Sequence, residues 1–289
     1  MLQVDNVHLY QIYYDDASFQ ALDAGFIPLD NRSNERPDWS EYWLIRHFLR
    51  THALKENDYY AFLSPKFELK TQLNAAQLMQ FVQASQRADV DAFIVSPFWD
   101  QAAFFQNVFE QGDFWHPDLM AVTQTFLQRI GNPTDLETLI THGQNTVFCN
   151  YIVAKPRFWY RWLALVEQLF NIAEASPEDE LGRCLTLGTR HNDQYSYPFK
   201  VFIQERLATL ILATESFNVV SYPLYHLPTL IDVFESCRSA LLDCDAHKQA
   251  FVRTGHVVFE RAYRESRRVV QQALDQSALS PPVRGGHHQ

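Results

Sequence analysis

Residues 59–95 read YYAFLSPKFELKTQLNAAQLMQFVQASQRADVDAFIV and contain a complete strand–helix–strand pattern. The aromatic and aliphatic run Tyr59–Leu63 predicts one strand, and Ala92–Val95 predicts a second. Between them, Asn74 is a predicted N-cap for a helix that ends near Arg87. Strands that alternate with helices in this way are typical of a parallel sheet, so the segment predicts an α/β fold.

The same alternation continues on both sides of this segment. Leu9–Tyr13 and Phe26–Leu29 predict two earlier strands, and Pro28 favours an edge position for the second because proline cannot donate a ladder hydrogen bond. One further strand is predicted from Thr146–Cys149 together with Tyr151–Val153, and a last short strand from Val219–Tyr222. The other predicted helices are Ala17–Ala24, Ser40–Arg50 with Ser40 as its N-cap, Gln101–Glu110, Asp118–Ile130, Pro156–Ala173 and Phe199–Ala213.

The second half of the chain is mostly helical by its pattern. Phe199–Ala213 is apolar nearly all round, which predicts a buried helix. The polar stretch 176–188 predicts a surface excursion, and the last helix is expected from Ala246 to about Leu274. We therefore expect an α/β core at 1–225, a helical C-terminal extension at 226–278 and a frayed tail at 279–289.

Composition sets limits on the class of protein. The 289 residues are 47% hydrophobic and 20% charged, which is an ordinary globular balance. The net charge of −10 argues against nucleic-acid binding, which needs clustered Lys and Arg. None of the four cysteines forms a C-x-x-C motif, and the sequence shows neither a signal-peptide pattern nor a run long enough to span a membrane. These features predict a soluble, cytoplasmic protein.

Five segments, in this order along the chain, carry a resemblance to a known family. They are a polar loop leading into Pro37-Asp38-Trp39-Ser40-Glu41-Tyr42; the strand segment 58–67, DYYAFLSPKF; the segment with His116 that opens a helix; the segment 150–159, NYIVAKPRFW; and the segment 200–207, KVFIQERL.

With these segments, the chain resembles a family of uncharacterised capsule and exopolysaccharide glycosyltransferases over roughly Leu9 to Tyr222. In that family a loop with Asn and Glu precedes a helix, a strand ends in GL-x-HYRR, and an N-M-x-I-x-K strand and an ER-L helix follow. Here Ser64-Pro65-Lys66-Phe67 stands where the family has His-Tyr-Arg-Arg. The resemblance implies a GT-A-like, mainly parallel sheet flanked by helices. It also implies a nucleotide-diphosphate sugar as donor and a surface polysaccharide or related glycan as acceptor.

Polar residues at the strand ends predict a pocket at the carboxyl edge of the sheet, where open α/β sheets bind ligands. Lys66 either neutralises the donor diphosphate or is an ordinary surface lysine. Tyr42 and Arg46 share a helix face, which suits base stacking and phosphate binding if that face borders the pocket. The candidate residues for binding the nucleotide sugar are Gln11, Tyr13, Asp30, Asn31, Tyr42, Arg46, Ser64, Lys66, Asn150 and Lys200.

Glu205 and Arg206 interrupt the otherwise apolar helix 199–213. Burying charge is costly unless it is paired or used. One interpretation is a structural Glu–Arg ion-pair network. The other, which the resemblance to the ER-L helix favours, makes Glu205 a general base that faces the acceptor, oriented by Arg206 or Lys200. We therefore assign Glu205 and Arg206 as the candidate catalytic residues.

Two further patterns carry less weight. Asp89-Val90-Asp91 matches the D-x-D pattern that holds a divalent ion in many GT-A enzymes. However, it precedes its predicted strand and so lies at the amino edge, which favours a solvated turn. No residue is assigned to a metal site, and dependence on a divalent metal stays open. His116 precedes Pro117 at a helix start, where a structural role is favoured over a ligand or base.

The predicted function is sugar transfer from a nucleotide-diphosphate donor to a glycan hydroxyl. The alternative is a non-catalytic binding or scaffold component of a polysaccharide-assembly system with the same fold. A nucleotidyltransferase is disfavoured because such enzymes usually have a Gly-rich phosphate loop, and none of the 9 glycines lies in such a run. The expected partners are the nucleotide sugar and the glycan acceptor, and a peripheral contact with a membrane-bound assembly system is left open.

Overall fold

The computed structural model describes residues 6–176, 178–190 and 196–278. Its centre is a six-stranded sheet with the order β2-β1-β3-β5-β4-β8, and β6 pairs with β7 in a separate two-stranded sheet. In the central sheet β5 runs antiparallel to β3 and β4, whereas the other neighbouring pairs are parallel. The predicted α/β class with a mainly parallel sheet is confirmed. The strands are β1 (Val7–Tyr13), β2 (Ile27–Asp30), β3 (Tyr59–Leu63), β4 (Ala92–Ile94), β5 (Ile152–Ala154), β6 (Gly188–Arg190), β7 (Ser196–Pro198) and β8 (Val219–Ser221).

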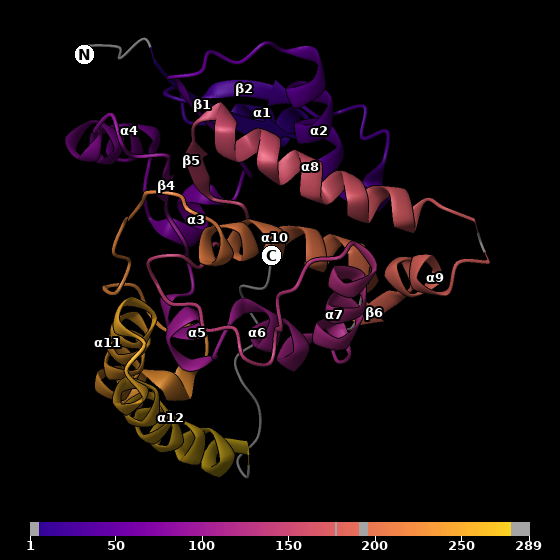
Figure 1. Ribbon diagram of the computed structural model, residues 1–289. Helices are drawn as coiled ribbons and strands as arrows, with labels where there is room; N and C mark the ends of the chain where they lie inside the picture. Colours follow the sequence, from indigo (N-terminus) through magenta and orange to yellow (C-terminus); the bar gives the residue numbers. More distant parts are fainter. Residues whose placement is uncertain (1–5, 177, 191–195, 279–289) are drawn as a thin grey trace.

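Helices surround the central sheet (Figure 1). Asn74 caps its helix with a reciprocal capping box, as predicted, and Pro156 is the first residue of the long helix that follows β5. The helices are α1 (Asp16–Gln20), η1 (Pro37–Trp39), α2 (Glu41–Thr51), α3 (Phe67–Thr71), α4 (Ala75–Ser85), α5 (Trp99–Phe104), α6 (Val108–Trp115), α7 (Leu119–Arg129), α8 (Pro156–Ala173), α9 (Glu180–Thr186), α10 (Phe199–Thr214), η2 (Asp232–Cys237), α11 (Arg238–Thr254) and α12 (Val257–Ala278).

The sheet separates two hydrophobic cores because successive side chains of a strand point to opposite faces. On β3, Tyr60 and Phe62 join the core that α2, α8 and α10 cover. Tyr59, Ala61 and Leu63 join the core on the other face, with residues of α4, α5 and α11. All five β3 side chains are therefore buried, as a central strand with helices on both faces requires.

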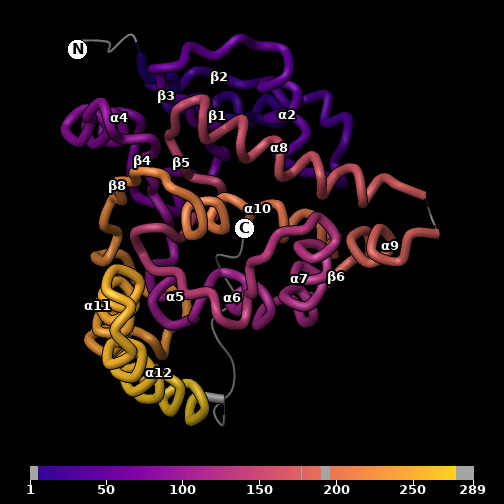
Figure 2. Tube along the Cα trace, in the orientation of Figure 1, coloured from indigo at the N-terminus to yellow at the C-terminus, as the bar shows by residue number. Residues whose placement is uncertain are grey.

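The helix α10 runs through the interior, between α8 and the pair α6 and α7 (Figures 1 and 2). It is buried on nearly all sides, as its sequence predicts. The Thr209 hydroxyl accepts a hydrogen bond from the Val147 amide at 2.9 Å, which ties the helix to the segment before β5. This contact fixes where α10 passes the sheet.

The C-terminal helices α11 and α12 are joined to the core by buried polar contacts. The buried Lys248 ammonium donates hydrogen bonds to the carbonyls of Ala102 and Phe105, at the end of α5. The Tyr263 hydroxyl donates to the Phe104 carbonyl at 2.9 Å. Leu241 and other side chains of this region also belong to the core on the α4 and α5 side of the sheet.

Three predicted elements are wrong in their extent. The predicted helix 101–110 is two helices, because the Asn107 side chain accepts hydrogen bonds from the Phe109 and Glu110 amides and caps a new helix. The part 146–149 of the predicted strand is a turn region instead, in which Cys149 and the next residue adopt positive φ. The predicted last helix is interrupted at Gly255, whose φ of +68° ends α11.

Other boundaries also differ from expectation. The polar stretch 176–188 contains α9, whose Leu181 and Leu185 are buried. Ser40 precedes α2 as expected, but its side chain makes no capping hydrogen bond. Pro28 does lie on an edge strand, since β2 is the outermost strand of the sheet. The predicted tail 279–289 lies outside the described residues.

In the part of the chain that the structure describes, no helix combines the length and the apolar character needed to cross a membrane.

Candidate active site

The carboxyl edge of the sheet gathers polar side chains from three strands. Because β5 runs antiparallel, the residues before it lie at the edge where β1 and β3 end. The Gln11 amide of β1 donates to the Ser64 carbonyl at 3.2 Å. The Ser64 hydroxyl lies 2.6 Å from the Tyr151 hydroxyl. The base of the site at this edge is therefore a buried polar floor, formed by Gln11, Ser64 and Tyr151.

A carboxylate from α2 and a phenol that follows β1 meet next to this floor. Glu41 is the first residue of α2, and the Tyr14 hydroxyl donates to its Oε1 at 2.7 Å. The carboxylate is surrounded by protein, yet the side chain of Glu41 keeps partial solvent contact. Burial, the largest cause, and the nearby charge of Glu205 together raise the pKa of Glu41 to about 7, against the opposing effects of Tyr14, Lys70 and Lys66.

A second carboxylate comes from α10. Between Phe199 and Leu212 every residue is buried except Glu205, which is partly exposed. Burial raises the pKa of Glu205, although Arg206 and Lys70 lower it in part. Since the pKa of Glu41 responds to Glu205, the two carboxylates share one site. A pair of carboxylates with raised pKa is the arrangement that enzymes use for proton transfer near neutral pH.

Two lysines from the start of α3 and its last turn complete the site. The Lys70 ammonium donates to the Cys149 thiol at 3.3 Å. Burial lowers the pKa of Lys66, and the positive charge of Lys70 lowers it further. The charges of Glu41 and Glu205 act on Lys70, but among the described residues neither lysine forms an ion pair with a carboxylate. The two cations are therefore available to an anionic ligand.

The backbone before β5 is strained. Cys149 and Asn150 have φ of +58° and +54°, a region that residues other than glycine rarely occupy. Such conformations typically persist where a functional site requires them. The Asn150 Oδ1 and the Gln11 Oε1 are buried acceptors, and no donor among the described residues reaches them. Both amide groups therefore suit a ligand that brings hydrogen-bond donors.

The structure brings together five of the residues that the sequence singles out at this edge. They are Gln11, Ser64, Lys66, Asn150 and Glu205.

Three other candidates lie in contacts between elements. The Tyr42 hydroxyl and the Arg46 guanidinium both bind Glu167 of α8, at 3.3 Å and 2.5 Å. The face that they share therefore packs on α8 and not on the carboxyl edge. The buried Lys200 ammonium lies 2.5 Å from Asp38 and over the Trp39 ring. In the folded protein, Tyr42, Arg46 and Lys200 therefore join structural elements to one another.

Arg206 is also engaged away from the site. Its buried guanidinium donates to the Val108 carbonyl, the Phe202 carbonyl and the Gln111 side chain, at 2.8–2.9 Å. Within the described residues it forms no ion pair with Glu205. The geometry therefore separates the two neighbours: Glu205 faces the site, and Arg206 joins α10 to α6.

The ends of β1 and β2 hold the remaining candidates. Asp30 pairs with Arg32 at 2.7 Å, and the Arg32 guanidinium also lies over the Tyr13 ring. The side-chain hydrogen bonds from Arg32 hold the pKa of Asp30 well below its ordinary value. The backbone amide of Asn31 donates to the backbone carbonyl of Tyr13 at 2.9 Å. These residues lie on the same sheet edge as Lys66, but the carboxylate of Asp30 is occupied by Arg32.

Asp91 and His116, for which the sequence favours roles outside the pocket, contact neighbouring residues. Asp91 lies at the amino edge, where its Oδ1 pairs with Arg157 and its Oδ2 accepts from the Asn218 amide. The His116 ring stacks on Phe202 with 3.7 Å between centroids. Among the described residues, no group of three or more His, Cys, Asp or Glu side chains is placed to hold a metal ion.

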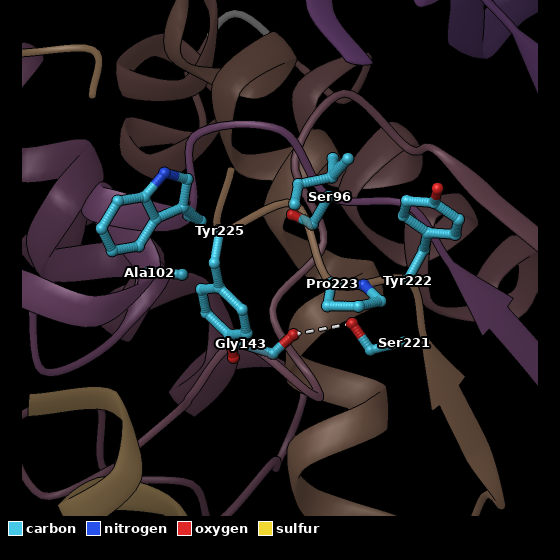
Figure 3. Close-up of a pocket in the computed structure, with 9 residues that line it drawn as sticks. Ser96, Ala102, Gly143, Ser221, Tyr222, Pro223 and Tyr225 are labelled. Atoms are coloured by element: carbon cyan, nitrogen blue, oxygen red, sulfur yellow. Dashed lines mark hydrogen bonds between the residues drawn. The ribbon is translucent and has the colours of Figure 1, made fainter. Parts of the chain in front are cut away.

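A small cavity lies further along the same edge, after β4 and β8 (Figure 3). In Figure 3, Pro223 lies between the rings of Tyr222 and Tyr225. The Ser221 hydroxyl donates to the Gly143 carbonyl at 3.0 Å. The cavity is lined by Ser96, Trp99, Ala102, Gly143, Ser221, Tyr222, Pro223, Leu224 and Tyr225.

Sequence reasoning missed four residues that the structure adds to the site, namely Tyr14, Glu41, Lys70 and Cys149. Glu41 had a detectable signal, because it lies in the segment Pro37–Tyr42 that carries part of the family resemblance, directly after the predicted cap Ser40. Comparisons of the chain with models of protein families, with curated proteins and with solved structures find no match.

We expect Glu41→Gln to raise the free energy of unfolding at about pH 8 by about 1–3 kcal/mol. Between the ordinary value of 4.5 and about 7, the folded protein holds a proton on Glu41 that the unfolded chain has lost. The contribution of Glu41 to the free energy of unfolding therefore falls as the pH rises from 4.5 to about 7. The Gln amide carries no charge and still offers an oxygen to Tyr14.

Chemical denaturation at about pH 4 and about pH 8 measures this effect, with Glu68→Gln on the exposed side of α3 as the matched control. We expect a gain for Glu41→Gln at the higher pH and none at the lower. An equal loss of stability at both pH values would show that Glu41 has an ordinary structural role.

Proposed function

We propose that the protein transfers a sugar from a nucleotide-diphosphate donor to a hydroxyl of a surface polysaccharide or related glycan. One observation carries this proposal: two carboxylates with raised pKa, Glu41 and Glu205, lie beside two cations without an ion-pair partner, Lys66 and Lys70, at the carboxyl edge of the sheet. A site of this kind suits a reaction that removes a proton from one substrate and releases an anion from the other.

The lysines are assigned to the donor diphosphate. Both belong to the short segment 64–71, in which β3 gives way to α3. A lysine ammonium stabilises phosphate oxygens as a compact point charge. On cleavage, the bond between the anomeric carbon and the phosphate oxygen breaks, and the leaving nucleoside diphosphate keeps the electron pair. Lys66 and Lys70 stabilise that added negative charge.

The acceptor hydroxyl is assigned to Glu205. Its carboxylate takes the proton as the hydroxyl oxygen forms the new bond to the anomeric carbon. Glu41 is already held by the Tyr14 hydroxyl, whereas Glu205 accepts no hydrogen bond from the described residues. Glu205 is therefore the carboxylate that is free to accept from the substrate. Its raised pKa brings its basicity closer to the working pH of a cytoplasmic enzyme.

The buried amides add support for a sugar. Gln11 Oε1 and Asn150 Oδ1 lack donors, and leaving such acceptors unpaired costs about 1–3 kcal/mol each. A sugar ring offers several hydroxyl donors. Binding of such a ring at the carboxyl edge would satisfy these two oxygens and position the anomeric carbon near Glu205.

The test is a thermal-shift screen with the nucleoside diphosphates UDP, GDP, CDP and ADP, each with and without Mn²⁺. A ligand that binds the native state at about 100 times its Kd adds about 2.7 kcal/mol to its stability. We expect one base to give a clear shift. We expect Lys66→Met and Lys70→Met to weaken that nucleotide by about 10–100-fold each, the loss typical of a hydrogen bond to a charged group.

Lys55→Met is the matched control, because Lys55 is an exposed lysine that lies before β3, at the opposite end of that strand. Its nucleotide affinity should equal that of the wild type. If no diphosphate shifts the wild-type protein, the proposal fails and the scaffold alternative gains support. Equal losses in all three variants would show a non-specific charge effect and would also contradict it.

A further inference from the structure

The turn between α11 and α12 presents apolar side chains to solvent. Seven consecutive residues, 252–258, are exposed, and three of them are valines. Val252, Val257 and Val258 are 47%, 53% and 61% exposed. Gly255 brings them together, because its φ of +68° ends α11 and lets α12 begin two residues later. We call residues 252–258 the valine turn.

The exposure is concentrated in this part of the molecule. Twelve large apolar side chains are exposed among the described residues, and five of them lie on α11, α12 or the turn between them. Besides the three turn valines, these are Leu242 and Val269. Isolated exposed apolar residues are normal, but a local group of them marks an interaction surface.

The charge around the valine turn is opposite to that of the whole chain. The protein has a net charge of −10, yet no acidic residue occurs between Asp245 and Glu260. Arg253 lies in the turn, and Arg261 and Arg268 are exposed on α12. These three arginines form no ion pair within the described residues, whereas Arg264 and Arg267 pair with Glu260 and Glu110. Glu265 is the acidic side chain on α12 that remains close to them.

We propose that the valine turn and the exposed arginines of α12 bind the surface of a membrane that contains anionic lipids. Short aliphatic side chains can enter the boundary between headgroups and acyl chains, while arginines beside them contact lipid phosphates. Arg253, Arg261 and Arg268 are exposed and form no ion pair among the described residues, so this surface offers uncompensated positive charge beside its valines. This charge is complementary to lipid phosphates and favours an anionic membrane surface as the occupant.

This binding is interfacial and reversible, and it does not depend on the proposed sugar transfer. The surface lies on the α11–α12 hairpin, whereas the candidate active site uses residues of β1, α2, α3 and α10. A failure of one proposal therefore leaves the other standing. If both hold, membrane binding would place the site near acceptors that are carried at the membrane surface.

The experiment is co-sedimentation of the full chain with vesicles of phosphatidylcholine alone and of phosphatidylcholine mixed with phosphatidylglycerol. We expect binding to the mixed vesicles, little binding to the neutral ones, and release near 1 M salt, where charges are screened within about 3 Å. Arg253→Gln with Arg261→Gln should weaken binding by about 25-fold, or about 5-fold per arginine. Val257→Ser with Val258→Ser should weaken it by at least about 10-fold.

Leu187→Ser is the matched control, because Leu187 is 59% exposed at the end of α9 and lies outside the hairpin. It should bind vesicles like the wild type. Equal binding to both vesicle types, or binding that neither double variant reduces, would overturn the proposal. A different pair of results would also overturn it: the wild type does not bind vesicles, and light scattering shows a wild-type dimer that dissociates in the valine variant. The surface would then join two copies of the chain.

Discussion

We expect Glu205→Gln to lower the rate of sugar transfer by about 10²–10⁴-fold, the usual contribution of a general base. Gln keeps the size of Glu but cannot take the acceptor proton. The affinity for the nucleoside diphosphate should not change, because Lys66 and Lys70 are untouched. The free energy of unfolding should not fall, since burial already works against the charged form of Glu205. Single-turnover rates and nucleotide titrations measure the two quantities separately.

Glu215→Gln is the control for this substitution. Glu215 lies directly after α10 and pairs with Arg161 at the surface, so it tests the loss of a glutamate near the same helix without touching the site. Its turnover should match the wild type. If Glu205→Gln instead lowers the melting temperature and leaves activity per folded molecule intact, Glu205 is structural and its assignment as the base is wrong.

The substitution Arg206→Met, at the next residue, should lower stability and leave turnover unchanged, which is the reverse of the result expected for Glu205→Gln. We expect it to lower the free energy of unfolding by about 3–5 kcal/mol, because three buried acceptors, on Val108, Phe202 and Gln111, lose their donor. Met keeps most of the apolar stem, so the loss reports on hydrogen bonding more than on packing. Urea denaturation measures the change in stability, and turnover of the folded fraction should stay near the wild-type value.

Arg87→Met serves as its control, because Arg87 is exposed and pairs only with exposed Asp89 in the described part of the chain. Its effect should stay within about 0.5 kcal/mol. Arg206→Lys should fall between the two, since an ammonium can reach some of the same acceptors. A stable Arg206→Met protein with lost turnover would contradict the structural role and would return Arg206 to the catalytic group.

The strands and capped helices of this fold were predictable because their signals are local. The run Tyr59–Leu63 is rich in the aromatic residues that favour strands, and Asn74 with Gln77 forms a capping box within four residues. The failures arise where a local signal competes with another. The run Thr146–Cys149 has strand composition, but the positive φ of Cys149 and of the residue after it turns the chain before β5 begins.

The candidate site was predictable where a polar residue ends a strand, as at Gln11, Ser64 and Lys66, or where a residue contradicts its surroundings. Glu205 stood out because a charge interrupts an apolar helix, and the structure leaves it accessible there. Tyr42 and Arg46 had no such signal. Their helix face is decided by Glu167, which lies more than 120 residues later in the chain. Tyr14 and Lys70 occupy ordinary polar segments, so only the folded arrangement brings them to the carboxylates.

Lys248 has a consequence for where the chain can be divided. Its ammonium occupies the carbonyls that end α5, and its helix supplies Leu241 to the core beneath the sheet. A fragment that stops near residue 226 would leave those carbonyls and that core surface open to water. Residues 227–278 therefore do not form a transplantable module: a laboratory that wants a shorter, crystallisable or fusible version must trim loops and keep this helical hairpin.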